Sequence, residues 1–107
     1  MGIVNSLSCS LGFSALARSL GAEVRRHGLV LPSFSSPPRI AGARRTIRRL
    51  HGGGVMISVS VRGRSVDDVL ADLVDGVIVA NGLSGREAEG WRLALRGAVL
   101  PEALAAA

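Results

Sequence analysis

The sequence contains no lysine and no tyrosine, and its one cysteine is Cys9. Without lysine the chain cannot contain the phosphate-binding loop of P-loop nucleotide-binding proteins, which ends in Lys-Ser or Lys-Thr. A lone cysteine excludes an internal disulfide, and one thiol with two histidines does not provide the ligand spacing of a zinc finger. We therefore expect a protein of the reducing cytoplasm that has no metal and no cofactor.

Long apolar runs and aromatic residues are also scarce. Gly76–Ala80 is the longest strongly apolar stretch, far short of the roughly 20 residues that a membrane span needs. Residues 1–17 contain no Lys or Arg, so the positive start of a signal peptide is missing and we expect no membrane association. All of the basic residues are arginine, a bias typical of GC-rich genomes, and we expect a bacterial protein.

The size and hydropathy of the chain favour one globular domain. Hydrophobic residues make up 48% of the 107 residues, and the mean hydropathy of +0.37 is too high for a disordered chain. The length excludes a TIM barrel and a complete dinucleotide-binding fold. We expect a single domain over residues 1–107, with frayed ends at 1–10 and 101–107 and a Pro/Ser-rich loop over 32–42.

Apolar residues at helical spacing predict three helices. The first covers Phe13–His27, where one face is apolar. The second begins after Ser65, which we expect to be its N-cap, and ends at Asn81. Ser84–Glu87 fits a capping box for the third helix, which Pro101 would interrupt or close. The expected buried face of this third helix consists of Ala88, Trp91, Leu95 and Ala98.

Alternating apolar and polar residues over Val55–Arg62 predict a strand with one buried face. A weaker strand pattern over Ala43–Leu50 precedes it, and His51–Gly54 would be the hairpin loop between them. Leu29–Leu31 predicts a short edge strand that Pro32 ends. The expected order is helix, short strand, β-hairpin and two helices, a small α+β domain whose helices cover one sheet face.

Charge is distributed unevenly along the chain. Residues 24–66 contain nine arginines and no acid, whereas residues 67–107 contain seven acids and three arginines. Such a basic segment favours an anionic partner. The other interpretation is that the basic segment faces the acidic one within the fold, and the sequence leaves both open.

The predicted hairpin places arginines and hydroxyl groups on its outer face if Ile47 points inward. Guanidinium groups bind phosphate through paired hydrogen bonds, and two-stranded ribbons enter nucleic-acid grooves. Arg45 and Arg49 would lie on the inner side, where Asp72 or Asp75 could neutralise them. The residues that we expect to contact an anion are Arg44, Arg48, Arg62, Arg64, Ser58 and Ser60.

Signals for catalysis are weak. His51–Gly54 resembles the glycine-rich loop of lipases and esterases, but the chain lacks the G-x-S-x-G turn that this family requires. Asp68, Asp72 and Asp75 share one helix face, which is typical of a solvated surface. We therefore expect a non-enzymatic binding protein that contacts an anionic partner, with nucleic acid as the candidate, through the Arg-rich hairpin.

The alternative function is a protein-interaction or homo-oligomerisation module whose arginines are paired internally with the acidic helix. The edge strand expected at Leu29–Leu31 would invite pairing with another chain. Phe34, between prolines, could anchor a partner or fold back to plug the core. A homodimer could also complete the sheet face of so small a domain.

Overall fold

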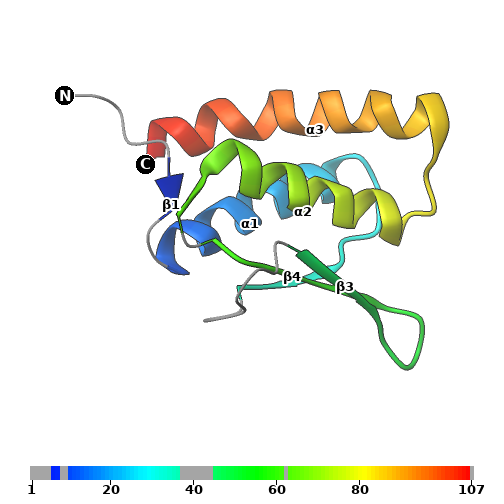
Figure 1. Ribbon diagram of the computed structural model, residues 1–107. Coiled ribbons are helices and arrows are strands. Elements are labelled where there is room, and N and C mark those ends of the chain that lie inside the picture. Colours follow the sequence, from blue (N-terminus) through cyan, green and yellow to red (C-terminus); the bar gives the residue numbers. More distant parts are fainter. Residues whose placement is uncertain (1–5, 8–9, 37–44, 62, 107) are drawn as a thin grey trace.

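The computed structural model describes residues 6–7, 10–36, 45–61 and 63–106, with side chains described for 12–36, 45–61 and 63–101. It shows a small α+β domain in which the helices lie on one side of a three-stranded sheet, as the sequence predicts (Figure 1). The elements are β1 (Ser6–Leu7), α1 (Ser10–Arg26), β2 (Ser33–Ser35), β3 (Arg45–Arg49), β4 (Val55–Val59), β5 (Arg64–Ser65), α2 (Val66–Ala80) and α3 (Gly85–Ala106).

The strand β4 is the centre of the sheet. It pairs antiparallel with β3, so the predicted hairpin is confirmed, and Ile47 lies opposite Ile57. On its other side β4 pairs in parallel with β2, where Phe34 is also opposite Ile57. All three residues face the helices, because the burial of β4 alternates along the strand and Ile57 is completely buried.

The predicted edge strand at Leu29–Leu31 is wrong, because the strand begins after Pro32, within the predicted loop. The side chain of Asn81 explains the shift. The Val30 N–H donates to Asn81 Oδ1, and Asn81 Nδ2 donates to the Val30 carbonyl, both at 2.8 Å. An amide side chain at the end of α2 thus satisfies the backbone groups that a neighbouring strand would need, and pairing starts only at Ser33.

The N-terminal segment also departs from the expected frayed end at 1–10. Ser6 and Leu7 pair antiparallel with Ser65 and Arg64 in a separate two-stranded ladder. This ladder lies beside the start of α2, since β5 leads directly into that helix. Residues 1–5 and 8–9 lie outside the described residues.

The core centres on α2, which packs against α3 on one side and β4 on the other (Figure 1). All six residues of the apolar stripe that the sequence predicts for this helix are buried: Val66, Val69, Leu70, Leu73, Val74 and Val77. On α3 the prediction is correct for Ala88 and Leu95 but wrong for Ala98, which is exposed while Val99 is buried. The buried line runs through positions 88, 95 and 99, and Ala98 lies to one side of it, beyond the half-buried Trp91.

The predicted ends of the last two helices are only partly correct. Ser65 is the N-cap of α2, where its Oγ accepts the Asp68 N–H at 3.1 Å. α3 begins at Gly85, directly after Ser84 as the capping box predicts, and the Ser84 carbonyl accepts the Ala88 N–H at 3.2 Å. The side chain of Ser84, however, makes no hydrogen bond with the described residues. Pro101 does not end α3, which continues to Ala106. The carbonyl that loses its donor belongs to Gly97, an exposed residue whose carbonyl water can reach.

We predict that Gly76→Ala destabilises the protein, because α2 and β4 approach closely at this position. A Cβ at position 76 would lie 2.8 Å from Cδ1 and 3.1 Å from Cγ2 of Ile57. Overpacking costs about 1–3 kcal/mol, which exceeds the gain of about 1 kcal/mol from removing a helical glycine. Urea denaturation should show a loss of about 1 kcal/mol for Gly76→Ala, which Ile57→Val should partly restore.

Gly90→Ala in α3 is the matched control, since a Cβ at position 90 would meet nothing within 4 Å. This control should raise the free energy of unfolding by up to about 1 kcal/mol. Equal stability of the two alanine variants would show that α2 and β4 do not touch at Gly76.

We also predict that Asn81→Ala lowers the free energy of unfolding by about 2 kcal/mol, since it removes three side-chain hydrogen bonds. Two of these bonds go to Val30, and the third runs from Asn81 Nδ2 to the Val77 carbonyl at 2.8 Å. Hydrogen exchange should show that the Val30 amide loses its protection. Ser84→Ala removes a hydroxyl group that makes no hydrogen bond with the described residues, and it should change the free energy of unfolding by less than about 0.5 kcal/mol. An unchanged Val30 amide in Asn81→Ala would disprove the contact.

Candidate anion-binding site

Two of the predicted site residues, Arg48 and Ser58, lie on the outer face of the sheet. This is the face turned away from the helices in Figure 1. The register places Arg48 opposite Met56 and Thr46 opposite Ser58, and these four side chains alternate with the inward-facing ones. Ser58 Oγ lies 2.9 Å from Ser35 Oγ, so the predicted site residue Ser58 is hydrogen-bonded to β2. That pairing depends on the parallel position of β2, which no local pattern in the sequence predicts.

Arg64, another predicted contact residue, is engaged within the fold. Its Nη1 donates to the Ser60 carbonyl at 3.0 Å and lies 2.7 Å from Asp72 Oδ2, an ion-pair contact without hydrogen-bond alignment. Its Nη2 donates to the Asp68 carbonyl at 3.2 Å. Only 15% of the Arg64 side chain is exposed, so Arg64 supports the start of α2 and is poorly placed to meet a ligand. Ser60, another predicted contact residue, contributes the backbone carbonyl that accepts the hydrogen bond from Arg64.

Two other carboxylates of α2, those of Asp67 and Asp75, are neutralised from two further directions. Arg45 of β3 and Arg92 of α3 both hold Asp75, with Arg45 Nη1 at 2.5 Å from Oδ2 and Arg92 Nε at 3.0 Å from Oδ1. Arg96 of α3 pairs with Asp67. The hydrogen bond to Asp75 raises the pKa of the Arg92 guanidinium. The sequence left pairing between Arg45 and this helix open as one interpretation, whereas the pairing of Arg92 and Arg96 depends on the packing of α3 on α2.

Arg48 and Arg49 are different, because both are exposed and neither forms an ion pair with a described residue. The sequence allowed both Arg45 and Arg49 to pair with Asp72 or Asp75, and of the two only Arg45 does so among the described residues. Arg49 does share the inner side of β3 with Arg45, but it lies four residues further along the strand, about 13 Å at 3.3 Å per residue. Arg45 therefore forms the ion pair with Asp75, and Arg49 lies too far along the strand to reach the same carboxylate.

These two arginines begin the part of the hairpin that we call the hairpin tip, residues 48–54. Figure 1 shows its loop projecting beyond the layer of helices. The loop is closed by a hydrogen bond of 2.8 Å from the Leu50 N–H to the Gly54 carbonyl, and its glycines at 52 and 53 have φ values of 91° and 94°. All of the residues 48–54 are exposed, including His51. The tip is thus a slender, cationic projection on a fixed base.

Three predicted site residues remain, Arg44, Arg62 and Phe34. Arg44 and Arg62 lie outside the described residues. Phe34, for which the sequence left two interpretations open, is half-buried and packs against the core. This position agrees with its interpretation as a core plug.

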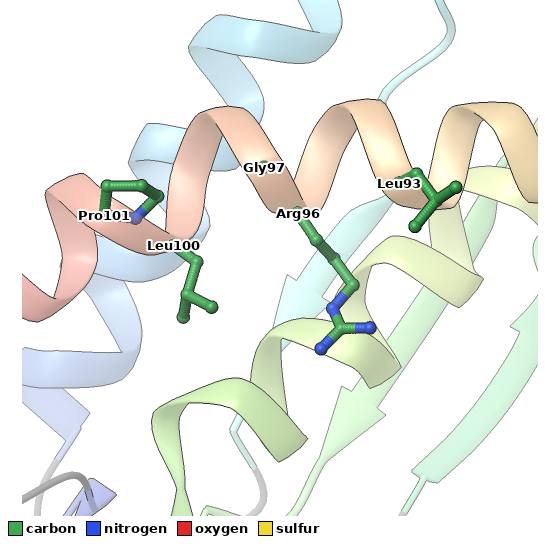
Figure 2. Close-up of a pocket in the computed structure, with 5 residues that line it drawn as sticks. All are labelled: Leu93, Arg96, Gly97, Leu100 and Pro101. Carbon is green, nitrogen blue, oxygen red and sulfur yellow. The ribbon is translucent and has the colours of Figure 1, made fainter.

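A second surface feature, on α3, was not predicted. Leu93 is 73% exposed, and it borders a shallow hollow of about 350 Å³ together with Arg96, Gly97, Leu100 and Pro101. Figure 2 shows the side chains of Leu93, Arg96 and Leu100 on the same side of the helix. The sequence contains one signal for this feature, because Leu93 and Leu100 do not lie on the helix face that Ala88 and Leu95 define.

In the part of the chain that the structure describes, no group of three or more His, Cys, Asp or Glu side chains could hold a metal ion. Among the same residues, no helix combines the length and the apolar character that crossing a bilayer requires. Comparisons of the chain with protein-family models, with curated proteins and with solved structures found no match.

Proposed function

We propose that the protein is a non-enzymatic module that binds a polyanionic partner, nucleic acid, through the hairpin tip. One observation carries the proposal. Among the described residues, Arg48 and Arg49 are exposed and have no carboxylate partner, while Asp67, Asp72 and Asp75 of α2 are already paired with Arg45 and with arginines of β5 and α3.

The proposal has a clear energetic basis. A guanidinium group binds phosphate through two parallel, charge-assisted hydrogen bonds. Because Arg48 and Arg49 have no ion-pair partner in the part of the chain that the structure describes, they can make such bonds without first breaking an ion pair there. The hydroxyl of Thr46, exposed two residues before Arg48 on the same face, can add a neutral hydrogen bond to a neighbouring phosphate oxygen.

The position of the tip also favours encounter with a large polyanion. The acids of α2 lie at the base of the hairpin, where Arg45 meets Asp75, and the hairpin itself contains no acid. The chain carries a net charge of +5, which attracts anions over a distance, and the unpaired charge at the tip directs them there.

Self-association is a second candidate function, and one observation favours it. Leu93 is the most exposed large apolar side chain described, and it stands beside the hollow on α3. Both features belong to one helix, so two copies related by a two-fold axis could cross their α3 helices and place each Leu93 at the hollow of the other copy.

For nucleic-acid binding, we predict that Arg48→Gln/Arg49→Gln lowers the affinity for a labelled DNA duplex at least tenfold at low salt. Fluorescence anisotropy at about 50 and 200 mM salt should show that the slope of log K against log salt falls by about 1.8, which corresponds to two lost phosphate contacts. Both side chains are exposed, so the fold should be unaffected.

The control for this experiment removes the same charge elsewhere. Arg18→Gln/Arg86→Gln replaces two exposed arginines that also lack an ion-pair partner among the described residues, and it should leave the affinity within about twofold. Equal losses in the two double variants would mean that net charge alone drives binding. A wild-type protein that binds no nucleic acid at low salt would overturn the proposal.

For self-association, we predict that Leu93→Glu raises the dimer dissociation constant at least tenfold in sedimentation experiments, because it places a charge in an apolar contact. Val30→Glu is the matched control, since Val30 is a second exposed apolar residue, 60% accessible and remote from the hollow in sequence. It should leave the constant unchanged. A wild-type chain that stays monomeric up to its solubility limit would exclude this second function.

A further inference from the structure

We infer that the hairpin tip binds double-helical DNA by entering the major groove. This inference rests on the proposed function and specifies its ligand. It follows from three properties of the tip: its width, the distribution of charge over its two faces, and the absence of an aromatic surface around it.

The width of the tip suits the major groove. Paired strands lie about 4.8 Å apart, and the major groove of B-DNA is about 12 Å wide and 8.5 Å deep, enough to admit a two-stranded ribbon. The end of the ribbon is slender, because residues 52–54 are glycines and carry no side chains. Figure 1 shows the loop at this end directed away from the helices, so the loop would enter a groove first.

Charge lies on both faces of the ribbon. Arg48 is on the outer face opposite Met56, and Arg49 is on the inner face opposite Val55. A flat anionic surface could engage only one of these faces at a time. A groove has a phosphate backbone along each side, so a ribbon inside it has phosphates next to both faces, and both arginines can bind simultaneously.

The aromatic residues argue against a single strand as the ligand. Proteins that bind single strands stack bases on aromatic side chains. The three Phe and Trp residues of this chain are used elsewhere. Phe13 is buried, Phe34 packs against the core, and Trp91 lies on α3, where its ring meets that of His27 at a centroid distance of 5.2 Å.

The groove geometry also distinguishes DNA from RNA. The major groove of an A-form RNA helix is deep and too narrow for protein side chains to read. His51 is the one loop residue between Leu50 and Val55 that has a side chain, so at the end of the ribbon it alone could reach a base edge. The arginines would then supply the affinity, and His51 a modest preference among bases.

The test compares three labelled ligands of one sequence: duplex DNA, duplex RNA and single-stranded DNA, each about 21 nucleotides long, or two turns of B-DNA. We expect the duplex DNA to bind at least tenfold more tightly than the other two. Bulky substituents on C5 of the pyrimidines, which fill the major groove, should weaken binding at least tenfold. A drug that fills the minor groove should have no effect.

Single variants test whether both faces are engaged. Arg48→Gln and Arg49→Gln should each weaken binding to the DNA duplex several-fold, whereas Arg86→Gln, on α3, should not. If one of the two tip variants binds as tightly as the wild type, contact is confined to one face and the groove is excluded.

The outcomes separate this inference from the function on which it rests. Equal binding of all three ligands, with the loss in Arg48→Gln/Arg49→Gln retained, would overturn groove entry and leave nucleic-acid binding by the tip intact. Displacement by the minor-groove drug would likewise overturn the major-groove assignment alone. Failure to bind any of the three ligands would remove both.

Discussion

The neutralisation of α2 by arginines from its neighbours is the interaction on which the surface chemistry of this protein depends. Asp67, Asp72 and Asp75 are met by Arg96, Arg64 and the pair Arg45 and Arg92, which come from α3, β5 and β3. Each exposed pair contributes little to stability by itself. Together they determine which arginines are engaged within the fold and which remain available to a partner.

The same pairing gives the hairpin two functionally different ends. At its base, Arg45 is attached to Asp75, and Ile47 and Ile57 pack beneath the helices. Towards the tip of the hairpin, the side chains of Arg48 and Arg49 are exposed on opposite faces of the two strands. Because the base of the hairpin packs beneath the helices, the backbone positions of Arg48 and Arg49 are constrained before a partner binds, which reduces the entropy lost on binding.

The parts of the fold that could be predicted from the sequence are those determined by local pattern. Alternation over Val55–Val61 predicts the central strand and its buried face, and Ser65 marks the start of α2, because these signals lie within a few residues of the element they define. Charge segregation allowed the attachment of Arg45 to the acidic helix but did not predict it, because an exposed basic surface was equally compatible with the pattern. It could not distinguish Arg45 from Arg49, since both lie on the inner side of β3 and only their distance from Asp75 differs.

What the sequence could not show depends on contacts between distant segments. The strand β2 is short and polar at two of its three positions, and it becomes a strand because β4 is beside it. The role of Asn81 is similar: Asn-Gly predicts the end of a helix, but nothing local indicates that the amide binds Val30. The position of Val99 in the core likewise depends on where α1 and α2 meet α3.

The pairing of β1 with β5 has a consequence for the order in which the chain can assemble. That ladder joins the start of the chain to the residues just before α2, and α1 packs on both α2 and α3. Closing such long loops is entropically costly, whereas the β3–β4 hairpin and the α2–α3 pair need only nearby segments. During synthesis α1 would emerge before α2 and α3, so it could not dock until both of these helices had been made.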